Sequence, residues 1–305
     1  MYPPRRATGS WRRSQGKPMS SSISAYRDQQ ILSRLLPQLS FKSTFAKWTA
    51  PLEGMSKTVL AAWRGVLLVA SLLLCALRFL GLSLRCCLSG SEVTPQQRAE
   101  WMHFCGRIVL GAIGIHSRVE GVLPQGSTLI AANHLSYLDI VIVSAALPAA
   151  FVAKLEIASW LGFGPLAKMG GAIFVDRASR ASAWDTADEM AQRLGTDVPV
   201  VLFPEGTSTD GSEVLRFHST LFAPAVEARI PVVPAAVFYE MKGTGTERNL
   251  CWFGDDAFLP HLLRVLRVEG FTAVVRFGQP EIYPDRQTAA WRSHDAIAAM
   301  RERKP

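Results

Sequence analysis

The sequence is poor in cysteine, and its cysteines are not spaced for metal binding. The 305 residues contain 5 cysteines, at positions 75, 86, 87, 105 and 251, and no Cys-x-x-Cys pair. Small secreted domains and zinc sites both depend on closely paired cysteines. The spacing therefore argues against a disulfide framework and a cysteine-based zinc site, and it predicts reduced cysteines packed in apolar surroundings.

A long uncharged apolar run is also missing. Within Lys57–Leu88 the longest uncharged stretch, Gly65–Leu77, has 13 residues, whereas a helix needs about 20 to cross a bilayer. Arg64, Arg78 and Arg85 follow one another at intervals of 14 and 7 residues, which keeps them near one helix face. This pattern predicts a helix in the headgroup region, or one tilted into a single leaflet with its arginines reaching water. Its distance from the N-terminus argues against a cleaved signal peptide.

Acidic residues are scarce at the start of the chain. Residues 1–57 contain ten Lys or Arg against Asp28 and Glu53, so they carry the whole formal net charge of +8. A basic segment with many serines buries too little apolar surface to fold alone. We predict a basic disordered arm over residues 1–57, of a composition attracted to anionic lipid or nucleic acid. A disordered tail without such a role, or a start at Met55, stays open as the alternative.

A second amphipathic helix is predicted over residues 95–114. Pro95 suits a first helical turn. The apolar stripe of this helix consists of Trp101, Phe104, Cys105, Ile108 and Ile113. Two such helices in tandem predict a membrane-lying helical hairpin over residues 58–115, with two ordinary core helices as the alternative.

From residue 116 onward, short β-type runs alternate with helix-length segments. The strand candidates are SRVEGV, STLIAAN, AAFVAK, GAIFVD, PVVLFPE, PVVPAAVFYE and TAVVRFG. This order predicts an α/β fold, a mixed and largely parallel sheet covered by helices, over residues 116–285, with a C-terminal helical tail over residues 286–305. Pro234 interrupts one run, which is typical of an edge or bulged strand. In such sheets chemistry is expected where strands end.

The stretch AANHLSYLDI places His134 and Asp139 five residues apart at the end of an apolar run. On one continuous helix their side chains would point about 140° apart, so they meet only if His134 lies in the turn before the helix. A carboxylate that holds one imidazole nitrogen leaves the other free to take a proton from a hydroxyl. The two residues are a candidate catalytic pair, although a single pair at this spacing also arises by chance.

Polar residues also follow the apolar strand VVLF. Glu205 can accept hydrogen bonds from ligand hydroxyls, and Gly206 and Thr207 form a turn whose backbone N–H groups can approach an anion or an oxyanion. A turn without function is the alternative. Ser208 lacks the second glycine of a Gly-x-Ser-x-Gly elbow, which argues against a serine hydrolase.

Two basic residues follow other strand candidates. Arg177 comes directly after GGAIFVD, and Lys154 ends AAFVAK. Arginine presents a fork suited to phosphate oxygens, and lysine adds a point charge. Both are candidate phosphate contacts, although either one alone is also typical of an exposed surface.

The blocks NHLSYLD, GAIFVDR, FPEGTS and VPAA occur in this order. With them the chain resembles the glycerolipid acyltransferase family, best represented by its 1-acylglycerol-3-phosphate acyltransferases. The resemblance covers about residues 100–280. It implies a membrane enzyme on the cytoplasmic face of the inner membrane that moves a fatty acyl group from acyl-CoA or acyl carrier protein to a lysophospholipid hydroxyl. The acceptor it implies is 1-acylglycerol-3-phosphate, and the product is phosphatidate.

The same resemblance implies roles for the candidate residues. His134 is the general base, Asp139 orients it, and Arg177 holds the acceptor phosphate. The residues implied to line the acceptor site are Glu205, Gly206, Thr207 and Lys154. No metal or cofactor is implied, because the acceptor oxygen attacks the thioester directly. Where a basic residue is expected near position 218 the chain has His218, with Arg216 as a possible substitute.

The sequence alone leaves other functions open. The same fold could act on another acceptor, such as a lyso-amino-acid lipid, which needs no phosphate contact. A non-catalytic lipid-binding protein at the membrane surface would not need a general base. A metal hydrolase with His134, Asp139 and His218 as ligands would need a geometry that these spacings do not suggest. No nucleic-acid partner is expected.

Overall fold

The computed structural model describes residues 56–160, 163–175, 180–242 and 245–302, with residues 180–186 described by their backbone alone. All of these residues belong to one compact unit, Lys42–Pro305. The predicted basic arm, apart from its last two residues, lies outside the described residues.

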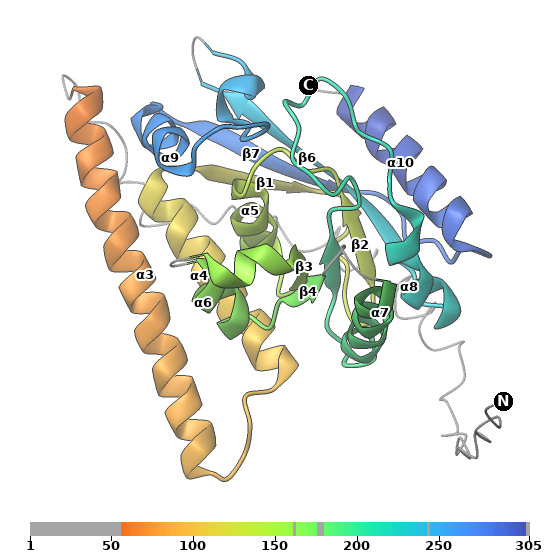
Figure 1. Ribbon diagram of the computed structural model, residues 1–305. Coiled ribbons are helices and arrows are strands. Elements are labelled where there is room, and N and C mark those ends of the chain that lie inside the picture. The colour runs from red at the N-terminus through yellow and green to blue at the C-terminus, as the bar shows by residue number, and fades with distance from the viewer. Residues whose placement is uncertain (1–55, 161–162, 176–179, 243–244, 303–305) are drawn as a thin grey trace, which may run out of the picture. The chain divides into compact units, whose positions relative to one another are not determined.

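A seven-stranded sheet forms the centre of the described chain (Figure 1). Its strands are β1 (His116–Glu120), β2 (Leu129–Ala132), β3 (Ala150–Lys154), β4 (Ile173–Val175), β5 (Val200–Leu202), β6 (Val232–Met241) and β7 (Phe271–Phe277). They lie in the order β1-β7-β6-β2-β5-β3-β4. The strands from β6 to β4 in this order are parallel, whereas β7 is antiparallel to β6 and parallel to β1. The predicted mixed, largely parallel sheet is confirmed.

β2 lies in the middle of the sheet. Ala131 pairs with Leu202 of β5 on one side and with Pro234 of β6 on the other. Because parallel strands end at one edge of a sheet, the residues that follow β2 and β5 lie side by side. The edge strand predicted at Pro234 is wrong, because β6 is an interior strand. Its regular antiparallel register with β7 begins at Ala235, opposite Phe277, whereas Val232 bridges Glu281 beyond the end of β7. The register therefore shifts by one residue beside the proline, which agrees with the bulged alternative.

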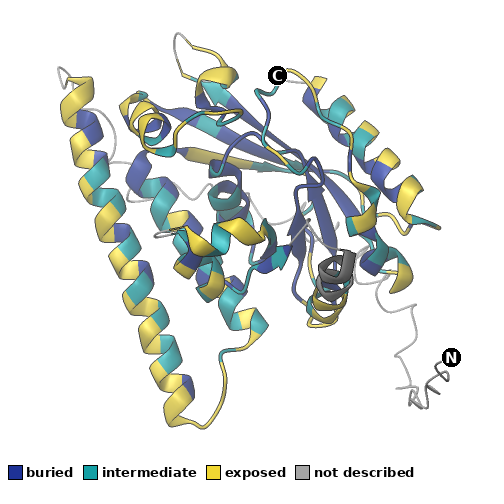
Figure 2. Cartoon of the chain, in the orientation of Figure 1, coloured by how far each residue is buried: buried dark blue, intermediate teal, exposed yellow. Residues whose placement is uncertain are grey.

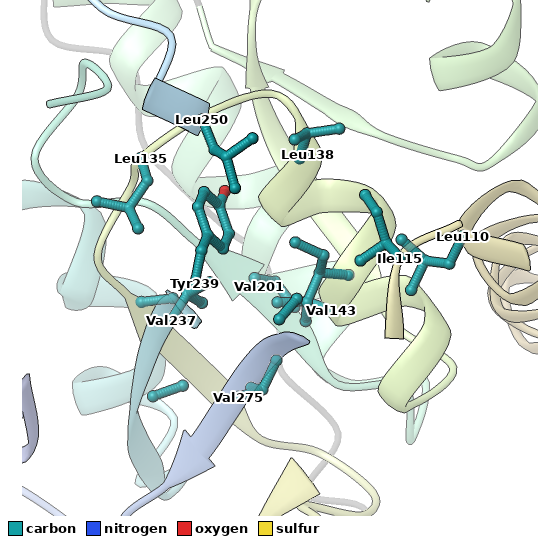
Figure 3. Packing of buried hydrophobic residues seen from close by; sticks show 14 of the residues in the cluster. Leu110, Ile115, Leu135, Leu138, Val143, Val201, Val237, Tyr239, Leu250 and Val275 are labelled. Carbon is teal, nitrogen blue, oxygen red and sulfur yellow. The ribbon is translucent and has the colours of Figure 1, made fainter. Parts of the chain in front are cut away.

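Helices cover both faces of the sheet (Figure 1). α4 (Pro95–Ile113), α5 (Leu138–Ala146) and α9 (Phe258–Arg267) contribute to the core on one face, and α7 (Arg180–Leu194), α8 (Ala223–Glu227) and α10 (Arg286–Glu302) to the core on the other. Successive side chains of a strand point to opposite faces of the sheet. In β2, Ile130 therefore packs into the core on one face and Leu129 into the core on the other. Figure 3 shows side chains of the first core, among them Leu110, Val143 and Val275. Shorter segments are α6 (Phe163–Met169), η1 (Leu155–Ser159), η2 (Ser219–Phe222) and η3 (Glu247–Leu250).

The helix α3 (Lys57–Leu88) is continuous over 32 residues. Ser56 caps it by accepting the N–H of Val59. We call its exposed apolar face the α3 stripe, visible in Figure 2, which consists of Val59, Trp63, Val66, Val69, Leu73, Leu77, Leu80, Leu84 and Leu88. By length and composition α3 is long and apolar enough to cross a membrane. A one-sided stripe at intervals of three or four residues fits a membrane-lying segment.

α4 packs between α3 and α5. Trp101 is buried, and its indole N–H donates to the carbonyl of Cys75 on α3 at 2.9 Å. On the other side of α4, a Cβ placed on Gly106 would lie 2.6 Å from the backbone nitrogen of Ala145 in α5. The two helix backbones therefore touch, and part of the apolar stripe predicted for α4 is covered by protein.

Arg64 occupies an environment that its sequence pattern does not indicate. The pattern groups it with two arginines that stay exposed, yet Arg64 is only 1% exposed. The last carbonyls of a helix lack intrahelical donors and attract cations, which gives a buried guanidinium its partners. The carbonyls that accept from Arg64, at 3.2, 2.5 and 3.4 Å, are those of Leu266, Val268 and Glu269 at the end of α9.

Replacing Arg64 by Ala is expected to lower the free energy of unfolding by about 2 kcal/mol or more, because buried carbonyls lose a charged donor. Thermal unfolding of the full chain in detergent measures the loss. Arg85→Ala is the matched control, since Arg85 lies exposed on the same helix. Equal unfolding temperatures for the two variants would contradict this assignment.

Candidate active site

The chain turns sharply between β2 and α5, and Asn133 holds this turn to the neighbouring strand. Its buried amide donates to the carbonyl of Val237 at 3.0 Å and accepts the N–H of Val237 at 2.8 Å. These two bonds link the end of β2 to β6. The residues that follow, His134 to Tyr137, form the turn before α5 begins at Leu138.

His134 and Asp139 meet across this turn. The Nδ1 atom of His134 lies 2.8 Å from Oδ2 of Asp139. Because an ionised carboxylate only accepts hydrogen bonds, Nδ1 is the donor and the lone pair of the neutral ring lies on Nε2. The side chain of His134 is 19% exposed and that of Asp139 is fully buried. The condition set by the five-residue spacing is met, since the histidine lies before the helix and the aspartate in its first turn.

Asp139 has three further hydrogen-bond donors. The backbone N–H groups of Leu135 and Ser136 donate to Oδ2 at 2.6 and 3.0 Å. The hydroxyl of Tyr239, on β6, donates to Oδ1. Burial raises the pKa of Tyr239 well above its usual value, so the phenol keeps its proton. A buried carboxylate is costly unless donors replace its hydration, and here these groups do so.

Phe203 lies directly against the imidazole. The ring centroids of His134 and Phe203 are 4.3 Å apart, with an angle of 23° between the rings. Stacking on one face and the carboxylate on one edge together limit rotation of the imidazole. The free nitrogen, Nε2, is the remaining route to a substrate.

Glu205 lies beneath the same turn. Its Oε1 accepts the backbone N–H of His134 at 2.7 Å, and its Oε2 accepts that of Leu215 at 2.8 Å. Burial raises the pKa of Glu205, and these two bonds and the nearby His134 partly offset that rise. The carboxylate therefore joins the end of β5 to the turn between β2 and α5. Contact between Glu205 and the acceptor stays a prediction.

Gly206, Thr207 and Lys154, the other predicted site residues that the structure describes, lie near the same edge of the sheet. Gly206 has a φ of +76°, a conformation that favours glycine, and Thr207 is exposed. Lys154 is exposed at the end of β3 and pairs in register with Val175 at the end of β4. Arg177, two positions further on, lies outside the described residues.

Two alternative chemistries find little support in the site. The hydroxyl of Ser208 donates to the carbonyl of Trp252 at 2.5 Å, which does not suit a nucleophile. His218 uses its backbone N–H to bond the carbonyl of Pro204. Among the described residues, no group of three His, Cys, Asp or Glu side chains is arranged to hold a metal ion.

An aromatic cluster that the sequence did not indicate lies beside the turn between β2 and α5. Tyr137 contacts the rings of Phe163, Trp252 and Phe258, with centroids 6.2, 5.6 and 5.1 Å apart. Its hydroxyl lies 3.0 Å from Nδ1 of His261, whose Nε2 lies 3.2 Å from a backbone carbonyl. A carbonyl only accepts, so Nε2 carries the proton and Tyr137 donates to Nδ1. These bonds and rings fix the far end of the turn.

Comparisons with known proteins point to one class. A family model described as Acyltransferase matches residues 115–238. The chain is 36% identical over 214 residues to the lyso-ornithine lipid O-acyltransferase of Brucella abortus, a match that covers 65% of this chain and 80% of that protein. It is 32% identical over 186 residues to the 1-acyl-sn-glycerol-3-phosphate acyltransferase of Neisseria meningitidis serogroup B, covering 60% and 72%.

A solved structure has the same fold. The crystal structure of the 1-acyl-sn-glycerophosphate acyltransferase PlsC from Thermotoga maritima matches with a TM-score of 0.60. The match covers 81% of this chain and 95% of that chain, at 17% sequence identity. At this identity the likeness shows the fold alone.

Replacing Tyr239 by Phe removes one donor from Asp139 and leaves the ring in place. The carboxylate then stabilises a protonated imidazole more strongly, so the acidic limb of the pH profile of acyl transfer is expected to move upward by roughly half a unit to one unit. Tyr283→Phe, in the core on the opposite face of the sheet, is the control. A uniform loss of rate with an unmoved limb would mean that Tyr239 only packs.

Replacing Glu205 by Gln leaves one of the two backbone N–H groups without an acceptor. We expect a loss of about 1–3 kcal/mol in the free energy of unfolding and a lower kcat with an unchanged KM for the lysolipid. Denaturant unfolding and steady-state kinetics measure both effects. A raised KM with unchanged stability would instead support the predicted contact of Glu205 with the acceptor.

Proposed function

Because this chain belongs to the glycerolipid acyltransferase family, we propose that its O-acyl transfer to a lysolipid takes place at the turn between β2 and α5. The observation that carries the proposal is the 2.8 Å contact between His134 and the fully buried Asp139. This contact leaves Nε2 of the imidazole as the proton acceptor. The turn also lies where parallel strands end, the usual place for a site in an open α/β sheet.

The reaction follows from this geometry. Nε2 of His134 takes the proton of the acceptor hydroxyl while the hydroxyl oxygen attacks the thioester carbonyl carbon. Asp139 stabilises the imidazolium that forms. The tetrahedral intermediate then collapses, the carbon–sulfur bond breaks, and the leaving thiolate takes up the proton. The acyl chain reaches the acceptor directly, with acyl-CoA or acyl carrier protein as the donor and no resident cofactor.

Two acceptors are candidates for this site. Lysophosphatidate, which is 1-acylglycerol-3-phosphate, is supported by the motif blocks and by Lys154, which ends β3 beside the strand that precedes Arg177. Lyso-ornithine lipid, an amino-acid-containing acceptor, is supported by the higher identity to the Brucella abortus protein, 36% against 32% for the Neisseria meningitidis protein. We rank lyso-ornithine lipid first on that difference. A phosphate contact from Arg177 would reverse the order.

The neighbours of α3 support one position of this helix relative to the membrane. α3 associates the chain with a membrane through the α3 stripe. If α3 crossed the bilayer, α4 beside it would carry the exposed side chains of Glu100 and Arg107 into hydrocarbon, which is costly. We therefore propose that α3 lies along one leaflet, on the cytoplasmic face of the inner membrane, where its thioester donors are found.

Acyl transfer from labelled acyl-CoA and from acyl carrier protein to both acceptors tests this proposal. His134→Ala is expected to lower the rate by about 10²–10⁴-fold, as for loss of a general base. Arg177→Ala should abolish transfer to lysophosphatidate and spare transfer to lyso-ornithine lipid. Full activity of His134→Ala would remove the proposed mechanism, and transfer to neither acceptor would remove the substrate assignment.

A further inference from the structure

The helix α9 exposes apolar side chains to the solvent. Leu259 is 61% exposed and Leu263 is 38% exposed. They lie four residues apart, on one face of the helix. The opposite face is buried through His261 and Val265. Folding therefore leaves two leucines pointing outward on a helix whose inner face is already covered.

α9 connects the membrane-lying helix with the catalytic turn. At its C-terminal end, the backbone accepts hydrogen bonds from Arg64 of α3. At its first residue, Phe258 lies 5.1 Å from the ring of Tyr137, centroid to centroid. Figure 1 shows α9 beside one end of α3. The exposed leucines thus lie on a helix that packs directly against α3.

The charges of α9 match an anionic surface. Its ten residues contain Arg264 and Arg267, both exposed, and no acidic residue. Arg264 lies 3.6 Å from Asp256, a pair of partly exposed groups that is weak in water. Leucines beside arginines on the outer face of an amphipathic helix are typical of helices at the headgroup level.

We propose that α9 is a second membrane contact. Leu259 and Leu263 enter the leaflet that holds the α3 stripe, while Arg264 and Arg267 contact the phosphates of anionic phospholipids. This inference rests on the proposed position of α3 and deepens it. Two contact lines, α3 and α9, fix the orientation of the catalytic domain about the axis of α3, which a single helix cannot do.

Depth-dependent quenching of a fluorescent label tests the contact without requiring any activity. The label is attached to Leu259→Cys in the full chain, with Cys87→Ser present because Cys87 is an exposed thiol. Leu73→Cys, on the α3 stripe, is the lipid-facing reference. Trp291→Cys, on α10 across the sheet, is the matched control, because Trp291 and Leu259 are both 61% exposed.

In vesicles of phosphatidylglycerol and phosphatidylethanolamine with nitroxide lipids, the label at 259 should be quenched like the label at 73 and at least about threefold more than the label at 291, as expected for burial among acyl chains. Quenching at 259 equal to that at 291 would overturn the contact. Equal quenching at 259 in vesicles of phosphatidylcholine alone would overturn the role of the arginines. If the label at 259 is already shielded from quenching before vesicles are added, another protein surface covers it. That result would overturn the lipid assignment.

A second measurement compares Leu259→Glu with Trp291→Glu. Leu259→Glu should lower acyl transfer to a vesicle-borne acceptor by about tenfold, the effect of losing one buried leucine, and leave transfer to a short-chain soluble lysolipid unchanged. Trp291→Glu should change neither rate. Loss on both acceptors with Leu259→Glu would show a folding defect and contradict the surface role. If the wild type acylates no acceptor, the proposed function fails, while quenching still decides the contact.

Discussion

The rest of the site depends on the burial of one carboxylate, that of Asp139. A charge removed from water is tolerated only where donors are already held in position. The donors come from the imidazole of His134, from two backbone N–H groups of the turn and from Tyr239 on β6. Satisfying one carboxylate therefore fixes the turn, the orientation of the imidazole and the spacing between β2 and β6. In Figure 3 the hydroxyl of Tyr239 points toward the turn between Leu135 and Leu138.

Local patterns in the sequence were sufficient for the strands and for the contact between His134 and Asp139. An apolar run that ends in His134, and another that ends in Glu205, mark two strand ends, and parallel pairing brings them together. Tyr239 could not be found in this way, because it lies 100 residues from Asp139 and its run is typical of any buried strand. The burial of Arg64 could not be predicted either. Its acceptors are backbone carbonyls about 200 residues away, and every residue type has a backbone carbonyl. The spacing of apolar and basic residues in FLPHLLRVLR is typical of an amphipathic helix. The prediction for this part of the chain contained strands and did not include that helix.

The sheet divides the described chain into two sides with different tasks. α3, α4, α5 and α9 lie on one side, together with the first turn of the catalytic helix and the exposed apolar residues of α3 and α9. α7, α8 and α10 close the other side and complete the second core. The proposed lipid contacts and the candidate catalytic pair thus lie on one face of the sheet. An acceptor that keeps its chain in the leaflet can approach the imidazole from that side without full extraction into water, which would expose its apolar chain.

The backbone contact at Gly106 has a mechanical meaning. A side chain there would collide with α5, so α4 and α5 meet without a compressible layer of side chains between them. α3 in turn is joined to α4 through Trp101. With α3 lying along one leaflet as proposed, this packing would hold the imidazole of His134 at a fixed height above the lipid. The three packed helices would then favour an acceptor whose headgroup raises its hydroxyl to that height.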